Sequence, residues 1–332
     1  MRRIMVTIVA LVLFFQQVYS TNVKAEGNEA LVTAEDAVQL VQNVTSYKLE
    51  KQDIDKEGGM YTSTVEDQTI AIGNDNSTSY IQKSALLGDV QVEVVPETED
   101  VATSVVDDTF VVENIEDSYF VTTEFFEGAI RNCFVIEEGC KEDDFDINFS
   151  LPEDAHIEFA KDDYDNTIDG SLVFYDKHNE IIGAATVPWA KDANGKELHT
   201  YYKINGTKIT QHIDYKNQKN IQYPIVADPL YSVGYFFDSA KWITRNGVVS
   251  LSLKPNNILR IAIITGSASM KQYSWDAIYN KFHKSSKWKN TSSMKKQFYC
   301  HWYFAQFKSK FNLEPSRPSV SWPKMIASGC NP

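Results

Sequence analysis

The sequence has few cysteines and histidines, and their spacing argues against the common metal sites. Its 332 residues include four cysteines and six histidines. No two cysteines have the CxxC spacing, and no cluster of histidines accompanies them, so a structural zinc site is not expected. The Gly-x-Ser-x-Gly elbow of many serine hydrolases is also missing. We expect neither a bound metal nor a cofactor.

Long apolar runs are missing beyond the N-terminus. Residues 4–15 are apolar apart from Thr7, follow two arginines and precede small residues, which is the pattern of a secretory signal peptide. A run of this length is too short to span a bilayer comfortably. We predict a signal peptide over residues 1–25, cleaved after Ala25 or after Ser20, and no transmembrane anchor. The mature protein is then expected to be secreted and extracellular.

Acidic residues are scarce near the C-terminus. Residues 231–332 hold 15 Lys and Arg but only three acids, Asp238, Asp276 and Glu314, for a net charge of +12. This leaves 17 of the 32 basic and 42 of the 45 acidic residues for residues 1–230, a net charge of −25, or −28 once the signal peptide is removed. The asymmetry predicts attraction between the two parts. It also predicts attraction of the basic part to phosphate-rich polymers or anionic surfaces.

The four cysteines fall into two groups, Cys133 with Cys140 and Cys300 with Cys330. Four cysteines allow three pairings, and the sequence alone does not choose among them. Local pairing, 133–140 and 300–330, fits both the charge division and an exported location.

The acidic part is predicted to be rich in strands. A short helix is expected to begin after an N-cap at Thr33. The rest of residues 26–149 is polar and alternating, which indicates exposed antiparallel strands. Residues 150–229 form a second antiparallel segment, with tight turns at Asn194-Gly195 and Asn205-Gly206. Its expected strands cover residues 171–175, 181–187, 200–204 and 207–215.

The basic part is predicted to be a small α+β domain of residues 230–332, which follows a proline-bounded junction near Asp228. Two strands flank Asn246-Gly247, a strong hairpin signal. The other expected elements are a strand over residues 258–264 and helices over residues 275–282 and 293–308, the last capped by Thr291 or Ser292. The fold class of the whole chain is therefore α+β, with a disulfide-linked C-terminal domain.

Short motifs near the C-terminus occur in a characteristic order. They are Cys300-His301, Asn312-Leu313-Glu314-Pro315, Arg317-Pro318 and Cys330-Asn331-Pro332. This set resembles the exported bacterial family called domain of unknown function 2599, over less than a third of the chain. Phe311 stands where that family more usually has Trp, which keeps an aromatic contact. The resemblance implies no activity.

His301, Glu314 and Arg317 are the most enzyme-like set of residues. A histidine and a carboxylate can share general acid–base work, and an arginine can bind a phosphate at two points, as cleavage of RNA would require. The alternative is structural: His301 packs within an aromatic helix, and Glu314 pairs with Arg317 to pin the tail.

A partial calcium-loop pattern occurs at Asp165, Thr167 and Asp169, with Asp176 at the twelfth position. The final Glu is missing, and no flanking helices are predicted. A turn that enters a strand is the preferred interpretation, so no metal site is expected.

A lysine cluster interleaved with aromatic residues suits nucleic-acid strands or anionic lipid surfaces. The alternative is a solvated lysine face over a helical core. The cluster consists of Lys281, Lys284, Lys287, Lys289, Lys295 and Lys296.

The leading functional hypothesis is a secreted precursor whose acidic leader neutralises a cationic domain that resembles a bacteriocin or toxin. The domain would act on anionic targets such as the bacterial envelope or nucleic acid, and its own acidic region would be a partner. Residues 187–195 and 223–229 loosely resemble stretches that precede varied C-terminal modules in secreted Gram-positive proteins, which agrees with a leader. One alternative is a small secreted nuclease that uses His301 and Glu314. Another is a non-enzymatic cell-surface binding module.

Overall fold

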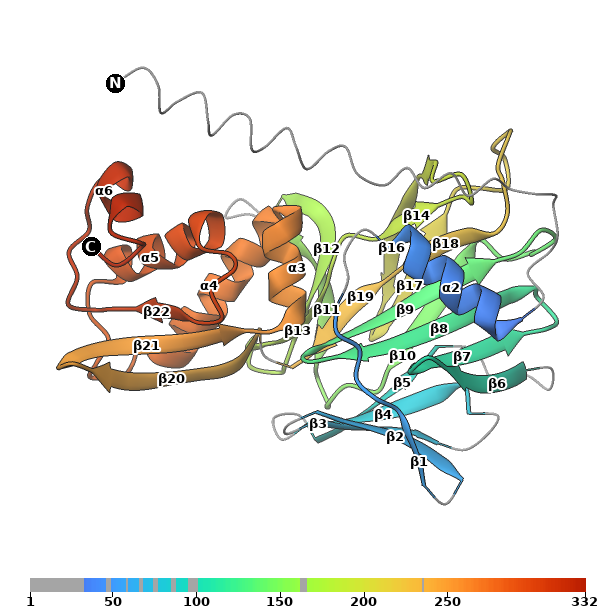
Figure 1. The fold of residues 1–332 in the computed structure, drawn as a ribbon, viewed down its shortest axis with the longest axis horizontal. Coiled ribbons are helices and arrows are strands. Elements are labelled where there is room, and N and C mark those ends of the chain that lie inside the picture. The colour runs from blue at the N-terminus through green and yellow to red at the C-terminus, as the bar shows by residue number, and fades with distance from the viewer. Residues whose placement is uncertain are drawn as a thin grey trace. The chain divides into compact units, whose positions relative to one another are not determined.

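Two antiparallel sheets account for most of residues 33–234, which we call the β region (Figure 1). The computed structural model describes residues 33–45, 49–57, 59–65, 68–73, 77–84, 88–94, 101–161, 166–234 and 236–332. The predicted signal peptide and Asp165 lie outside the described residues.

The first sheet has eight strands in the order β1-β2-β3-β4-β5-β10-β17-β16. The second has eleven, in the order β11-β12-β13-β19-β9-β18-β14-β15, with β8, β7 and β6 continuing from β9. The bounds are β1 (Asp55–Glu57), β2 (Met60–Val65), β3 (Gln68–Gly73), β4 (Ser79–Ser84), β5 (Gly88–Glu93), β6 (Val101–Val106), β7 (Thr109–Asn114), β8 (Tyr119–Phe126), β9 (Ala129–Ile136), β10 (Asp144–Phe149), β11 (His156–Lys161), β12 (Thr167–Tyr175), β13 (Ile181–Ala185), β14 (Trp189–Lys191), β15 (Glu197–Leu198), β16 (Thr200–Asn205), β17 (Lys208–Ile213), β18 (Ile225–Asp228) and β19 (Leu230–Val233).

The sheets pack face to face around one apolar core, to which both contribute. Strand alternation divides β9 between two environments: Phe134 and Ile136 belong to this core, whereas Cys133 and Val135 lie on the outer face of the eleven-stranded sheet. Strands β8 and β9 are buried along their whole length. The predicted exposed strands of residues 26–149 are therefore wrong for β8 and β9, because both of their faces are covered.

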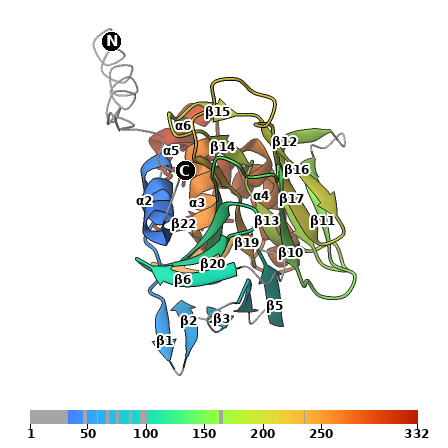
Figure 2. The ribbon, with the colours of Figure 1, turned by 90° about the vertical axis from the view of Figure 1, so that its right-hand side faces the viewer.

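Helix α2 (Ala34–Val44) and the C-terminal region cover the outer face of the eleven-stranded sheet. The hydroxyl of Thr33 accepts a hydrogen bond from the backbone N–H of Asp36, which confirms the predicted N-cap. The apolar face of α2 packs on the outer side chains of β7, β8 and β9. Figure 2 shows α2 and the C-terminal helix α3 on the same side of the strands.

The C-terminal region, residues 236–332, combines one antiparallel sheet of the order β20-β21-β22 with short helices. Its elements are β20 (Phe237–Arg245), β21 (Val248–Pro255), α3 (Asn257–Thr265), α4 (Ala268–Phe282), α5 (Thr291–Phe304), β22 (Phe311–Leu313) and α6 (Trp322–Ala327). Asn246 and Gly247 both have positive φ, 49° and 79°, as a two-residue hairpin turn requires. The predicted hairpin and the α+β class are confirmed.

The strand predicted over residues 258–264 is wrong, because this segment is helix α3. The side chain of Asn256 caps the helix by accepting from the N–H of Leu259 at 3.1 Å, and Gly266 ends it with a φ of 75°. A short apolar run does not distinguish a buried strand from a buried helix by periodicity. The third strand is β22 instead, which pairs with β21.

The two other predicted helices are present with different bounds. Helix α4 begins earlier than expected, at Ala268, where Ser267 caps it. Helix α5 begins at Thr291 and ends at Phe304, and its N-cap is Asn290 rather than Thr291 or Ser292. The predicted end at Lys308 is too late, because residues after Phe304 form the loop that leads into β22.

The β region and the C-terminal region share an apolar cluster. Helix α3 packs against β19 and helix α4 against β12. Leu230 of β19 and Leu259 of α3 are both fully buried in this cluster. Lys254 and Glu127 form an ion pair across the boundary. Residues 31–332 form one compact unit, and the predicted junction near Asp228 lies between two strands of the same sheet, β18 and β19.

The Cys300–Cys330 disulfide is present, as predicted. The predicted 133–140 disulfide is not formed: Cys133 and Cys140 are both buried and unbonded. Cys133 lies on the outer face of β9 beneath α2, whereas Cys140 packs in the core between the sheets. The two thiols are on opposite faces of the sheet, which is the physical reason for the difference. Among the described residues, no helix is long and apolar enough to cross a membrane.

Candidate anion-binding site

A groove of about 480 Å³ runs along the outer face of the three-stranded sheet. On β20, Lys241, Ile243 and Arg245 line this groove because alternate residues of a strand share one face. Lys241 pairs with Ser252 on β21, and Ser252 pairs with Asn312 on β22, so these residues form one row across the sheet. Lys308, Ser309 and Lys310, from the loop before β22, complete the lining.

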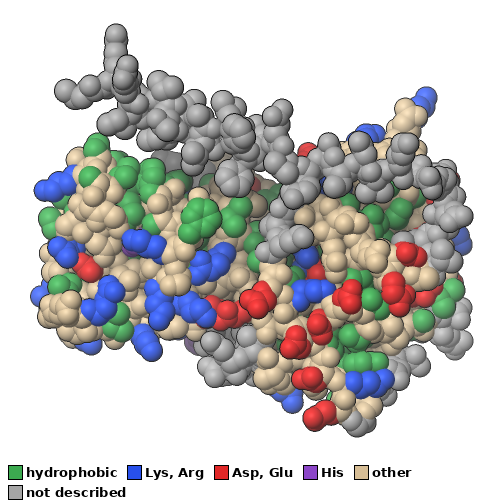
Figure 3. All heavy atoms as spheres, viewed as in Figure 1, with side chains coloured by type: hydrophobic (Ala, Val, Ile, Leu, Met, Phe, Trp, Pro, Cys, Tyr) green, Lys and Arg blue, Asp and Glu red, His purple; other side chains and the backbone are tan. Residues whose placement is uncertain are grey.

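The groove is strongly cationic. Lys241, Arg245, Lys308 and Lys310 are all exposed. Within the part of the chain that the structure describes, none of these four side chains forms an ion pair with a carboxylate. Ser252 and the amide of Asn312 add neutral hydrogen-bonding groups, and the Oδ1 atom of Asn312 is buried without a partner. In Figure 3, Lys and Arg gather over the C-terminal region and Asp and Glu over the β region.

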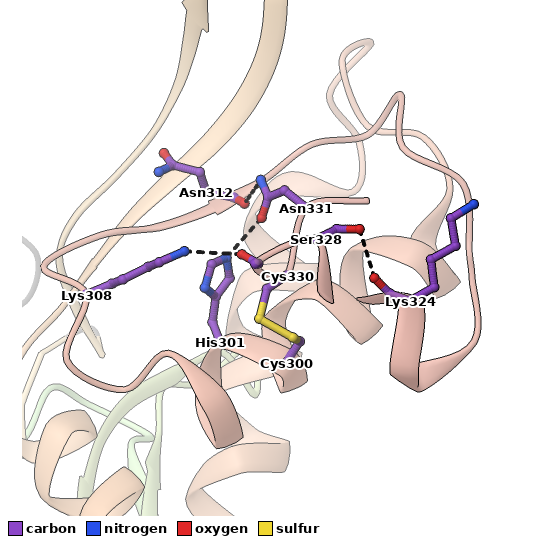
Figure 4. Close-up of a disulfide and its surroundings, with 9 residues drawn as sticks. Cys300, His301, Lys308, Asn312, Lys324, Ser328, Cys330 and Asn331 are labelled. Atoms are coloured by element: carbon purple, nitrogen blue, oxygen red, sulfur yellow. Dashed lines mark hydrogen bonds between the residues drawn. A yellow bond between two sulfur atoms is a disulfide. The ribbon is translucent and has the colours of Figure 1, made fainter. Parts of the chain in front are cut away.

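The loop that forms one wall of the groove is held by hydrogen bonds at Lys308 and Ser309. Arg260 of α3 donates from Nη2 to the carbonyl oxygen of Ser309 at 3.1 Å. The Nζ atom of Lys308 donates to the carbonyl oxygen of Gly329 at 3.2 Å, next to the disulfide (Figure 4). These bonds hold the backbone of the loop beside β20, so an anion in the groove meets a loop that is already in place.

Residues of three C-terminal motifs, His301, Asn312 and Asn331, meet beside this loop (Figure 4). The Cys300–Cys330 bond brings the neighbouring residues His301 and Asn331 together. The Oδ1 of Asn331 lies 3.2 Å from Nε2 of His301, and its Nδ2 donates to the carbonyl oxygen of Asn312 at 2.9 Å. The ring of His301 also stacks on Phe311 at 5.0 Å. These contacts fasten β22 to α5 and to the C-terminus.

Burial lowers the pKa of His301 to about 4, and the positive charge of Lys308 acts in the same direction. The side chain is only 2% exposed, and its Nδ1 atom has no hydrogen-bond partner. His301 is therefore neutral at neutral pH and is shielded from a substrate in solution.

Glu314 is also buried, and its groups are used within the fold. The amide of Gln297 bonds to both the N–H and the carbonyl oxygen of Glu314, at 2.8 and 3.1 Å. The carboxylate accepts from Nε of Arg317 at 2.6 Å. His301 forms a hydrogen bond with Asn331, whereas the Glu314 carboxylate forms one with Arg317. The three predicted catalytic candidates thus take part in two separate structural contacts.

The six predicted anion-binding lysines do not form one patch. Lys281, Lys284, Lys287 and Lys289 are exposed at the end of α4 and in the turn before α5. Lys295 lies over the rings of Trp275 and Tyr299, with Nζ 6.0 and 5.5 Å from the ring centroids. Lys296 extends the other way, to the carbonyl oxygen of Val320 and the ring of Trp322.

The sequence interpretation missed the cationic groove itself. The alternation of Lys241, Ile243 and Arg245 on a predicted strand was a usable signal for a basic face. Lys308 was assigned to the end of a helix and Lys310 to the segment after it, and nothing local places them beside β20. The juxtaposition arises only when β22 pairs with β21.

Two groups of acidic residues resemble metal ligands. Asp169, from the partial calcium pattern, instead accepts hydrogen bonds from the hydroxyls of Ser171, Ser267 and Ser269. Asp143, Asp144 and His212 lie close together, but Asp144 is already bonded to Lys203. In both groups the oxygens have protein partners.

The comparisons with known proteins concern the region that holds the groove. The family described as "Protein of unknown function (DUF2599)" matches residues 237–332. Uncharacterized proteins Rv0477 of Mycobacterium tuberculosis and Mb0487 of Mycobacterium bovis are each 34% identical over 99 residues, which is 29% of this chain and 64% of theirs. The chain thus spans 64% of the length of these relatives.

Uncharacterized protein ML2452 of Mycobacterium leprae is 31% identical over 108 residues, which is 31% of this chain and 84% of that protein. The matched region begins at β20 and includes the hairpin, the disulfide and the buried motif cluster. Through its C-terminal region, the chain belongs to the family of proteins of unknown function called DUF2599.

Proposed function

We propose that the C-terminal region is a non-enzymatic domain that binds polyanions outside the cytoplasm, on a secreted protein whose signal peptide is removed. The observation that carries the proposal is the groove with four cations and no paired carboxylate among its described neighbours. A groove of this kind attracts phosphate or other anionic groups by Coulomb interaction.

The buried polar cluster supports a structural role for the enzyme-like residues. His301 is neutral and enclosed, and Glu314 is bonded to Gln297 and Arg317. A general acid or base must reach the proton that it transfers, and these two groups do not reach the surface. The cluster instead positions β22, and with it the basic loop.

The position of the junction favours a permanent attachment of the β region over its removal as a leader. Asp228 is fully buried on β18, and the strand lies between β9 and β14. Proteases cut exposed and locally mobile segments. The acidic region would then act as a scaffold, and its charge would reduce binding to anions except at the groove.

Binding of the whole chain to inorganic polyphosphate at several salt concentrations tests the proposal. A cation near an anionic surface contributes about 1 kcal/mol. Replacing Lys241 and Arg245 together by Gln should lower the affinity about 30-fold and reduce its salt dependence. The matched control replaces Lys203 and Lys208, which pair with Asp144 and Asp146 in the β region. Equal losses in both variants, or an affinity insensitive to salt, would contradict the proposal.

Incubation of the same protein with RNA and with DNA separates binding from catalysis. Intact nucleic acid after incubation is the expected outcome. Cleavage that disappears in a His301→Gln variant, while the fold is retained, would support the nuclease alternative instead.

A further inference from the structure

The C-terminal region exposes large aromatic side chains beside its basic groove. Tyr303 and Phe304, at the end of α5, are 50% and 57% exposed, and Phe307, in the next loop, is 89% exposed. The same loop supplies Lys308 and Lys310 to the groove. Exposed apolar rings next to unpaired cations are the two components of an interfacial membrane-binding surface.

Hydrogen bonds and a cation–ring contact hold the segment that carries these exposed rings. The guanidinium of Arg260 donates to the carbonyl oxygens of Lys308 and Ser309, which follow Phe307. The Nζ atom of Lys308 donates to the carbonyl oxygen of Gly329. Lys271 lies over the rings of Tyr299 and Tyr303, with Nζ 5.1 and 4.9 Å from the centroids. The backbone of the loop thus presents Phe307 outward from a fixed base. Figure 3 shows hydrophobic side chains beside Lys and Arg at the surface of this region.

We propose that residues 304–310 dock the protein on an anionic lipid bilayer. Phe304 and Phe307 enter the boundary between the headgroups and the acyl chains, while Lys308, Lys310 and the cations of β20 contact the headgroup phosphates. This inference rests on the proposed function and specifies its ligand.

The placement of the aromatic rings favours lipid over single-stranded nucleic acid. A groove that binds a single strand interleaves its cations with aromatic rings, on which the bases stack. No aromatic residue lines the groove of residues 241–312, whose one apolar member is Ile243. The exposed rings instead follow one another along residues 303–307: those of Tyr303 and Phe304 have centroids 6.2 Å apart, and Phe307 is in the next loop.

Sedimentation of the whole chain with vesicles tests the inference. Vesicles of equal parts phosphatidylglycerol and phosphatidylcholine should bind the protein, and vesicles of phosphatidylcholine alone should bind it weakly. Replacing Phe304 and Phe307 together by Ser should lower the affinity for the anionic vesicles about 30-fold, because both rings lose their apolar contact. The same variant should bind polyphosphate as the parent does. A Tyr201→Ser variant is the matched control, because Tyr201 is 39% exposed in the β region.

The outcomes separate the two proposals. If the Phe304/Phe307 variant binds anionic vesicles as the parent does, or if the parent binds polyphosphate but not vesicles, the lipid inference is wrong and polyanion binding stands. If the parent binds neither ligand, both proposals are wrong. If the parent binds single-stranded RNA in preference to vesicles, and the aromatic variant loses that binding, the ligand is nucleic acid and the lipid inference fails.

Discussion

The β region and the C-terminal region differ in how their Lys and Arg side chains are paired with carboxylates. In the β region, several cations are tied to carboxylates: Lys51, Arg131, Lys161, Lys203, Lys208 and Lys216. In the C-terminal region, Lys254 and Arg317 form ion pairs, whereas the four cations of the groove have no carboxylate partner among the described residues. The first region pairs many of its cations internally, and the second leaves the four cations of the groove available to an external anion.

The same contrast holds for aromatic residues. The β region buries Phe110, Phe120, Phe125, Phe134 and Phe174 completely. The shorter C-terminal region buries Phe298 and Phe311, yet leaves Phe304 and Phe307 exposed. The β region therefore pairs its charges and buries its aromatic side chains within itself, as a scaffold does. The C-terminal region leaves apolar and charged side chains exposed to a partner.

The largest expected effect concerns the apolar contact that joins the two regions. Leu230→Ala should destabilise the protein by about 4 kcal/mol, because a fully buried leucine in the shared cluster is truncated. Chemical denaturation followed by tryptophan fluorescence and by far-UV circular dichroism measures this. We expect both signals to change in a single transition.

The control breaks the ion pair instead. Glu127→Gln removes the carboxylate of the partly exposed pair with Lys254, leaves the Lys254–Asp238 pair in place and should cost less than about 1 kcal/mol. A larger loss from Glu127→Gln than from Leu230→Ala would show that charge, and not apolar packing, holds the regions together.

The disulfide offers the next comparison. Replacing Cys300 and Cys330 by Ala should cost about 3.6 kcal/mol, because the bond closes a loop with a sequence separation of 30. Denaturant unfolding with and without a reducing agent measures it. Cys133→Ala is the control, because this thiol is buried but unbonded in the β region. Insensitivity of the Cys133→Ala variant to the reducing agent, together with sensitivity of the double variant, would contradict the assignment.

The smallest effect is the pH dependence due to His301. Its pKa is lowered to about 4 in the native state, whereas in the unfolded chain it is about 6.5. Below about pH 6.5 the unfolded chain binds a proton that the native protein does not, so stability is lost as the pH falls from there to about 4. The loss approaches about 3 kcal/mol.

Urea unfolding at pH 7 and pH 4.5 measures this loss, and His301→Gln should reduce it. His178→Gln, an exposed substitution in the β region, should leave the difference between the two pH values unchanged. Equal pH dependence in the His301 variant and the parent would contradict the assignment.

Local signals predicted those elements that depend on neighbours in sequence. The Thr33 cap and the Asn246-Gly247 hairpin rest on contacts within a few residues, and both are confirmed. The segment of residues 258–264 was predicted wrongly, because a short apolar run fits a buried strand and a buried helix equally. Its caps, Asn256 and Gly266, were the local signal that could have decided the question.

The candidate site was only partly predictable. The motif order indicated a related group of proteins, and the excess of basic residues indicated an anionic partner. Which lysines line the groove was not predictable, because Lys241 and Lys308 become neighbours only through the pairing of β22 with β21. The opposite faces of Cys133 and Cys140 likewise follow from the packing of two sheets.

The sequence by itself determined the charge division, the turns and caps, and the order of the C-terminal motifs, because these depend on composition or on neighbouring residues. Only the tertiary structure decided which cations share a groove, which aromatic rings stay outside the core, and that His301 is buried and neutral. Those properties depend on contacts between segments far apart in the chain, and burial, more than residue type, sets the charge state and reach of each side chain.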